Sequence, residues 1–204
     1  LLKTTTMANL CEHLISKDIN FDCEDLVYRG LEPDGLIINR SDIDFSKTTF
    51  NETNKNIIEG LVLKTGKKAY EVVQMGSTPF SGTTSELQVG TYRNTWNHSV
   101  AIFIPVNTPE VCADIIDPLS NGTFVLILRN KAKGADGSAE YQIYGYNQGC
   151  TASEGTNERY SEDTDGGWLM TMTENNSPKS GMFLFKTDAE TTAGLYEALK
   201  SAAE

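Results

Sequence analysis

Two runs of almost entirely apolar residues constrain the fold of this chain more than any other feature. They extend from Ser99 to Val106 and from Thr123 to Leu128, and both are rich in β-branched and aromatic residues. Strands that are apolar at nearly every position are buried on both faces, whereas strands of alternating polarity are half exposed. We therefore expect these two runs to form central strands, with a third strand from Glu140 to Tyr146.

A short helix is predicted between the two apolar runs. Thr108 is suited to cap its start, Pro109 fits the first helical position, and Glu110 suits the positive end of the helix dipole. Pro118 is expected to limit this helix to little more than two turns. Because the remaining strands have the pattern of antiparallel hairpins, we favour a passage between two sheets over a crossover within one sheet.

Shorter strands are predicted on both sides of this central part. A Glu-Pro-Asp-Gly sequence at 32–35 is interpreted as a turn, because proline presets φ and glycine accepts a positive φ. The predicted strands are 26–29 and 36–39 around that turn, a hairpin of 56–63 and 69–75, a short strand at 87–89, and strands at 168–173 and 181–185. The acidic segment after Gly149 is interpreted as a loop. The pattern predicts one mainly β domain over 1–204, an antiparallel β-sandwich or barrel-like fold with a short internal helix and a helix at each terminus.

The N-terminal helix is expected within a helical extension formed by residues 1–25. Leu10 and Leu14 lie one turn apart on a segment from about Met7 to Ile19, and together they form a modest apolar stripe. A helix this short must dock on another surface to persist. Both leucines are therefore candidates for a contact between subunits.

The C-terminal helix is expected within residues 187–204. Thr187 and Glu190 have the spacing of a capping box, in which two side chains bond reciprocally to backbone amides. Leu195 and Leu199 mark its buried stripe. This helix also depends on docking, so these two leucines are further interface candidates.

The connection from 76 to 90 is the least structured part of the chain by composition, with many Gly, Ser and Thr residues. Long connections inside compact domains are usually functional or disordered. Phe80 has no obvious core partner there. We interpret Pro79 and Phe80 as candidates for contact with a neighbouring subunit; the alternative is that Phe80 folds back on its own domain.

The charge of the chain restricts the partners that it can have. A formal net charge of −11 disfavours adhesion to nucleic acid or to an anionic membrane, since such binding needs a concentrated basic patch. No run approaches the ~18 apolar residues of a membrane helix, and the polar first residues do not resemble a signal peptide. We expect an unsecreted protein that does not bind membranes.

Residues that carry chemistry are sparse. The only histidines are His13 and His98, and His98 cannot pair with Ser99 because neighbours on a strand point to opposite faces. Segment 41–46 lacks the glycine and glutamate of a calcium loop, and 60–68 lacks the spacing of a phosphate-binding loop. The four cysteines form no Cys-x-x-Cys pair and are interpreted as free thiols. We therefore predict no catalytic residues, no metal site and no cofactor.

The order of motifs from about 26 to 186 resembles that of phage tail-tube proteins and related virion proteins. The residues that carry the resemblance are Gly90-Thr-Tyr92, Trp96-Asn-His-Ser-Val100 and Tyr144-Gly-Tyr-Asn-Gln-Gly149, followed by an acidic stretch and Trp168. The resemblance implies a β-sandwich with a flanking helix that stacks as hexameric rings around a DNA conduit. It further implies contacts with copies of itself and with other virion proteins, assembly in the host cytoplasm, and passage of DNA without base recognition.

Other classes of protein stay open. A β-sandwich adhesin or carbohydrate-binding module would require an exposed aromatic platform, to which Trp96, Trp168 and the tyrosines are the candidates. A different head-tail connector protein of a phage would share the assembly chemistry. An enzyme of another family would require a pocket with converging polar groups.

Overall fold

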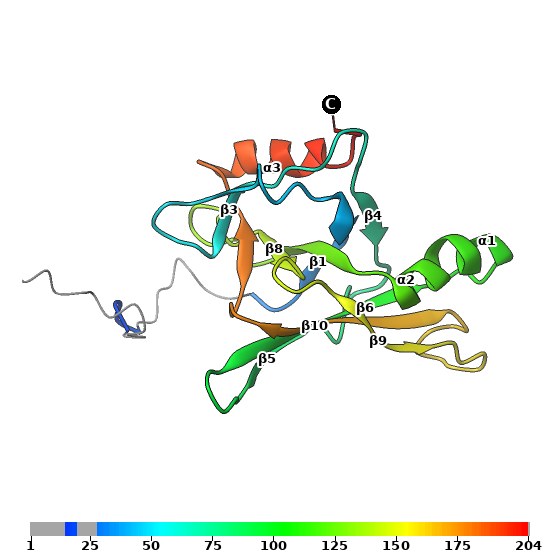
Figure 1. The fold of residues 1–204 in the computed structure, drawn as a ribbon. Coiled ribbons are helices and arrows are strands. Elements are labelled where there is room, and N and C mark those ends of the chain that lie inside the picture. The colour runs from blue at the N-terminus through cyan, green and yellow to red at the C-terminus, as the bar shows by residue number, and fades with distance from the viewer. Residues whose placement is uncertain (1–14, 20–27, 204) are drawn as a thin grey trace, which may run out of the picture.

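The computed structural model describes residues 15–19 and 28–203, and it stacks two β-sheets and a helix in three layers (Figure 1). The seven-stranded sheet forms the middle layer. The four-stranded sheet covers one of its faces, and α3 (Ala189–Ala198) lies over the other. The fold is mainly β and mostly antiparallel, which confirms the predicted fold class at that level.

The strands of each sheet are far apart in sequence but adjacent in space. The seven-stranded sheet has the spatial order β2 (Thr49–Phe50), β3 (Ile57–Gly60), β11 (Met182–Leu184), β8 (Tyr141–Tyr144), β7 (Phe124–Asn130), β1 (Leu31–Asn39) and β4 (Tyr70–Val73). The four-stranded sheet has the order β5 (Thr84–Gln88), β6 (Thr95–Ile104), β10 (Trp168–Ser177) and β9 (Thr151–Thr156). One short 3-10 turn, η1 (Arg40–Asp42), follows β1. The only parallel pair among the described strands is β11 with β3.

Two hydrophobic cores lie on the two faces of the seven-stranded sheet. One core includes Val125, Ile127 and Tyr196 and lies on the side of α3. The other lies between the two sheets and includes Leu126, Leu128 and Met172. Strand β7 contributes alternate side chains to both cores, which explains why its sequence is a continuous apolar run.

The predicted helix connects the two sheets. It consists of α1 (Pro109–Val111), a π-helical segment η2 (Cys112–Ile116) and α2 (Asp117–Asn121). Thr108 accepts a hydrogen bond from the amide of Val111, as its predicted capping role requires. The chain enters this segment from β6 and leaves it into β7, which confirms the passage between two sheets. Pro118 does not end the helix, because it falls in the first turn of α2, where a missing amide is tolerated.

Two strand predictions are wrong for reasons that lie outside the local sequence. The expected turn at 32–35 is part of β1, where a shift of register between Leu31 and Gly35 accommodates the proline. The expected hairpin of 56–63 and 69–75 does not form, since β3 pairs with β2 and β11 whereas β4 pairs with β1. The segment between them instead passes the C-terminal end of α3, where the amide of Ala69 donates to the carbonyl of Leu199 at 2.8 Å.

The termini also differ from expectation. Asp188, and not Thr187, caps α3 by accepting a hydrogen bond from the amide of Thr191 at 2.7 Å. Thr187 has φ of 60°, so the predicted capping box with Glu190 is wrong. The predicted N-terminal helix lies outside the described residues except for 15–19, which are not helical. The acidic segment after Gly149 contains strand β9, which the loop prediction missed.

Substitution of two glycines should affect stability in opposite directions. A Cβ atom at Gly35 would lie 2.8 Å from a methyl group of Leu128 and 3.0 Å from the carbonyl of Ile127, so Gly35→Ala should lower the free energy of unfolding by about 1–3 kcal/mol. A Cβ atom at Gly194 in α3 meets nothing within 4 Å, so Gly194→Ala should raise that free energy by about 1 kcal/mol. Urea denaturation measures both values, and equal effects would contradict the packing at Gly35.

Candidate functional site

Phe80 is buried between the two sheets and is not exposed. Its side chain is 3% accessible and belongs to the core that contains Leu128 and Tyr144. The backbone of Phe80 has φ of 54°, a left-handed conformation that costs of order 1–3 kcal/mol in a residue other than glycine. The hydroxyl of Thr83 donates to its carbonyl at 2.8 Å and holds this turn. Of the two interpretations of Phe80, the structure shows the one in which it folds back on its own domain.

The other predicted interface residues are likewise taken up by the fold or lie outside its described part. Pro79 is buried beside Phe80. Leu199 is 5% exposed and belongs to the core under α3, while Leu195 is half-buried. Leu10 and Leu14 are not among the described residues. The structure contains one chain and therefore does not test whether these residues contact another subunit. Their interface role stays a prediction.

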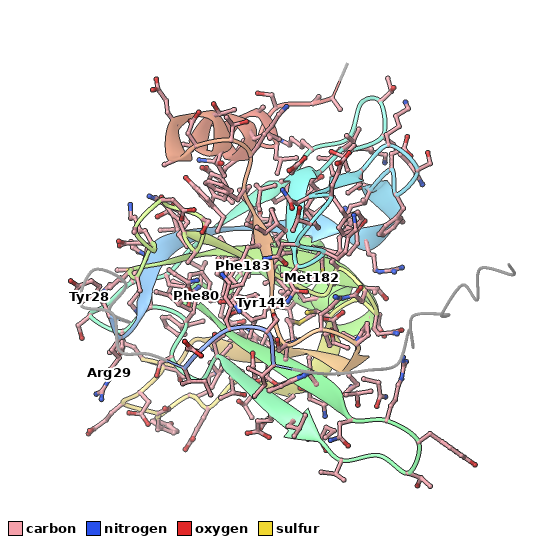
Figure 2. All side chains as sticks on the ribbon, turned by 90° about the vertical axis from the view of Figure 1, so that its left-hand side faces the viewer. Tyr28, Arg29, Phe80, Tyr144, Met182 and Phe183 are labelled. Atoms are coloured by element: carbon pink, nitrogen blue, oxygen red, sulfur yellow. The ribbon has the colours of Figure 1, made fainter. Side chains whose placement is uncertain are left out.

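A cavity of about 1190 Å³ lies next to Phe80 at one end of the sheets. Its floor includes Phe80, Tyr144 and Phe183, which Figure 2 shows together near the centre of the molecule, while Tyr28 and Arg29 lie at the edge. Burial raises the pKa of the Tyr144 phenol well above its usual value, so the floor is neutral. We refer to this space as the Phe80 cavity.

The polar lining of the Phe80 cavity is mixed. Arg29, Lys131 and the carboxylate Asp136 lie at its rim with several hydroxyl groups, and its described lining contains no histidine. Asp136 accepts a hydrogen bond from the amide of Ser138 at 2.9 Å, and bonding to Ser138 lowers the pKa of the Asp136 carboxyl. The Asp136 carboxylate therefore stabilises the turn in which it lies.

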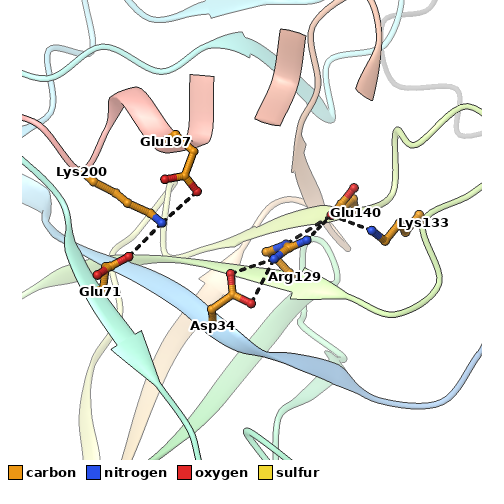
Figure 3. Close-up of polar contacts among 7 residues, drawn as sticks. All are labelled: Asp34, Glu71, Arg129, Lys133, Glu140, Glu197 and Lys200. Atoms are coloured by element: carbon orange, nitrogen blue, oxygen red, sulfur yellow. Dashed lines mark hydrogen bonds and ion pairs between the residues drawn. The ribbon is translucent and has the colours of Figure 1, made fainter. Parts of the chain in front are cut away.

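An ionic network fastens three segments of the seven-stranded sheet (Figure 3). Arg129 on β7 contacts both carboxylate oxygens of Asp34 on β1 at 3.0 and 2.9 Å, and it contacts Glu140 at 2.7 Å. Lys133 reaches the same oxygen of Glu140 at 3.0 Å. Burial opposes the charge of Arg129, but the hydrogen bonds to Glu140 and Asp34 outweigh it and raise the pKa of the guanidinium.

His98 is buried and fully hydrogen-bonded. Its Nδ1 atom lies 2.8 Å from the hydroxyl of Ser85, and its Nε2 atom lies 2.9 Å from the carbonyl of Lys179. A carbonyl can only accept, so Nε2 donates to the carbonyl of Lys179, and in the neutral imidazole Nδ1 accepts from the hydroxyl of Ser85. The partner of His98 is thus Ser85 on the neighbouring strand, which a search along one strand could not find. One bond joins β6 to β5, and the other joins β6 to residue 179 just after β10.

The remaining ionisable groups form no metal site in the part of the chain that the structure describes. No three His, Cys, Asp or Glu side chains among residues 15–19 and 28–203 are grouped to hold a metal ion. Cys112 and Cys150 are free thiols, and burial raises the pKa of the Cys150 thiol above its usual value. None of the helices in this described part has the length and hydropathy needed to span a bilayer.

The four-stranded sheet has one face that points away from the seven-stranded sheet. Met170 and Met172 belong to the core between the sheets, so their neighbours Leu169, Thr171 and Thr173 point to the opposite face. Hydroxyl groups bond to one another across this outer face: Thr173 lies 3.0 Å from the hydroxyl of Ser99 on β6 and 2.8 Å from that of Ser153 on β9.

All the charged residues in the four strands of this sheet are acidic. Its four strands contain Glu86, Glu154 and Glu174 and no Lys or Arg. Glu174 is buried and accepts hydrogen bonds from the amides of Gly145 and Gln148 at 3.1 and 2.8 Å, so it serves the core side. The outer face therefore presents hydroxyl groups and isolated carboxylates together with the apolar side chains of Leu169 and Phe103, and these strands contribute no cation to it.

Neither edge strand of the four-stranded sheet, β5 or β9, has a second strand partner, although α2 packs against β9. All five residues of β5 are exposed, and five of the six residues of β9 are exposed. The three strand pairs are antiparallel, so β5 and β9 run in opposite directions. Unpaired edges of this kind are templates for pairing with another chain.

Comparisons with known proteins give no match: no protein family, no curated protein and no solved structure corresponds to this chain.

Replacement of Phe80 should test its place in the core. Phe80→Ala is expected to lower the free energy of unfolding by about 3 kcal/mol, because it removes a fully buried aromatic ring. Tyr92→Ala is the matched control, since Tyr92 is 100% exposed and its loss should change stability by less than about 0.5 kcal/mol. Guanidinium unfolding of both variants gives the comparison, and a neutral Phe80→Ala would show that the loop does not seal the core.

The ionic network should matter more than a surface pair. Arg129→Ala leaves the buried carboxylate of Glu140 with Lys133 alone, and we expect a loss of about 2 kcal/mol. Lys200 pairs with Glu71 and Glu197, whose side chains are 60% and 63% exposed, so Lys200→Ala should cost less than about 1 kcal/mol. Thermal unfolding at neutral pH measures both, and a smaller effect at Arg129 than at Lys200 would be inconsistent with this geometry.

Proposed function

We propose that this protein is a self-assembling structural subunit of a phage virion, of the tail-tube kind, that forms rings around a passage for DNA. The observation that carries the proposal is the four-stranded sheet, which combines two unpaired edges with strands free of Lys and Arg. The flanking helix α3 and the two-sheet core agree with the architecture that the sequence resemblance implies.

The direction of the edges supports a closed assembly. Because the sheet has an even number of alternating strands, β9 of one copy and β5 of the next would pair antiparallel, as every other pair in the sheet does. A contact between two different surfaces of identical copies is heterologous, and it produces a ring when the rotation between copies closes. The main-chain groups of β5 and β9 would supply the hydrogen bonds.

The charge of the outer face supports the passage of a polyanion. DNA binds proteins through Lys and Arg contacts to phosphate, and each contact releases counterions. A wall with hydroxyl groups and isolated carboxylates offers no such contacts. DNA would slide along this surface without being retained.

A carbohydrate-binding module is the second candidate, and exposed tyrosines favour it. Tyr28, Tyr92 and Tyr160 are 64%, 100% and 97% exposed. They come from three separate segments, whereas Trp168 is half-buried and donates its indole N–H to Asn107. A shared stacking platform would need these rings to converge, so the assembly proposal has the better support.

Electron microscopy of the concentrated full chain tests the proposal directly. Rings or tubes are expected, together with a rise in sedimentation coefficient as the concentration increases. A compact monomer at the highest soluble concentration, with or without other virion proteins present, would contradict self-assembly. Binding of the monomer to a glycan array would instead support the second candidate.

A single added cation should make the passage retain DNA. Thr171→Lys places an ammonium group on the outer face of the four-stranded sheet, and the assembled variant should bind duplex DNA in a salt-dependent manner. Ala198→Lys adds the same charge on α3, across the seven-stranded sheet from that face, and should not. Filter binding at two salt concentrations compares them, and equal retention by both variants would argue against this face as the wall.

A further inference from the structure

The tip of the β5–β6 hairpin is an exposed apolar surface with a positive charge. Every residue from 89 to 94, which we call the hairpin tip, is exposed. Val89 is 83% and Tyr92 is 100% exposed, and Leu87 just before the tip is 48% exposed. Arg93 is the only charged residue among these six. Apolar groups that are gathered and exposed in this way mark an interaction site more often than scattered ones do.

The hairpin tip has a defined shape. The amide of Gly90 lies 3.4 Å from the side-chain oxygen of Asn94, and a Cβ atom at position 90 would collide with the carbonyl of Arg93. The turn is therefore tight, and the positions of Tyr92 and Arg93 follow from it. A surface that is ordered before binding pays less conformational entropy on association.

A cleft of about 530 Å³ lies at the opposite end of the molecule, between β4 and the helical segment 109–121. Figure 1 shows β4, α1 and α2 far from the tip of the β5 hairpin. The floor of this β4 cleft includes Ile102, Leu119 and Phe124, all buried. Its mouth has three exposed apolar side chains: Tyr70, Val73 and Ile115 are 53%, 64% and 41% exposed.

The charge of the β4 cleft is opposite to that of the hairpin tip. Its described lining contains Glu71 and Asp114 and no Lys or Arg. Glu71 already contacts Lys200 at 2.8 Å, so Asp114, exposed on the π-helical segment, is the carboxylate best placed to meet an incoming cation. The remaining acidic residues of the helical segment, Glu110 and Asp117, add to the negative field.

We infer that the hairpin tip of one copy docks in the β4 cleft of a second copy, with Tyr92 in the apolar cleft and Arg93 beside Asp114. This inference rests on the proposed self-assembly and names the side chains that make its contact. The occupant is a copy of this chain because the two surfaces match in polarity, are complementary in charge and lie at opposite ends of the same molecule. Aromatic residues and Arg are also the residue types that most often dominate interface energies.

Cross-linking between two differently labelled variants tests this contact. One population carries Thr91→Cys, which leaves Tyr92 and Arg93 in place, and the other carries Ile115→Cys, both in a background with Cys11, Cys23 and Cys112 changed to Ser. A short bis-maleimide should produce a cross-linked dimer in the mixture and not in either population alone. Tyr160→Cys replaces Thr91→Cys in the matched control, since Tyr160 is exposed on a different loop, and it should give no dimer with Ile115→Cys.

A charge exchange gives a second readout that does not depend on cysteine chemistry. Arg93→Glu should reduce the yield of the cross-link between positions 91 and 115, and Asp114→Arg in the receiving copy should restore it. Each variant is first checked for native circular dichroism, so that loss of the cross-link cannot be attributed to unfolding. No restoration, or an equal yield from the Tyr160 control, would overturn the inference.

The two proposals fail in different ways. Rings or tubes in electron microscopy without a cross-link between positions 91 and 115 would leave self-assembly intact and reject the docking of the hairpin tip. A specific cross-link in a sample that forms only dimers would support the docking and reject the ring. A monomer that gives no cross-link would reject both.

Discussion

The burial of β7 on both faces is the constraint on which the rest of the structure depends. Val125 and Ile127 pack toward α3, while Leu126 and Leu128 pack toward the four-stranded sheet. Each fully buried side chain of this size contributes about 1.5–3 kcal/mol by removal from water. Because β7 contributes side chains to both cores, loss of either outer layer would expose an apolar face of the middle sheet. The three layers are therefore expected to form one cooperative unit.

The parts of the fold that could be predicted from the sequence are those that neighbouring residues determine. An apolar run reveals burial on both faces, so β7 was identifiable, and a Thr-Pro-Glu sequence reveals the start of a helix at residue 108. The passage from β6 through that helix to β7 was favoured because the remaining strands have an antiparallel pattern, since the length of the connection alone allowed either kind of passage. In each case the pattern that carries the prediction lies within a few consecutive residues.

The parts that could not be predicted depend on partners far away in the sequence. Strands β3 and β4 look like a hairpin locally, but the backbone between them bonds to the end of α3 at Leu199, which no local pattern contains. Phe80 lies in a polar loop, yet Gly35 leaves room for its ring: a Cβ atom there would approach the ring to 3.4 Å. Ser85 similarly meets His98 only through the pairing of β5 with β6. Partner choice in a sheet is a long-range property, and composition does not encode it.

The choice of interface residues from the sequence had the same limit: local sequence does not show which apolar residues have partners far away in the chain. Leu199 and Phe80 were chosen as interface residues because they are apolar and near the ends or loops, but those properties equally suit the core that they enter. The exposed apolar surface lies instead on the hairpin tip and at the mouth of the β4 cleft. The three-dimensional structure is needed to distinguish apolar residues that are buried in the core from those that stay exposed.

An unpaired sheet edge and a shaped side-chain contact would have complementary roles in an assembly. Main-chain pairing between β5 and β9 would fix the relative direction of the two strands but would specify their register only weakly. Both strands are polar and exposed, so a slip of two residues would keep the same kind of backbone pairing and bury no different side chains. A side chain such as Tyr92 in a cleft permits one position only, since a shift of two residues along a strand, roughly 7 Å, would remove it from its pocket. The combination would let the walls close with a single geometry, without placing a cationic group of these strands in the path of DNA.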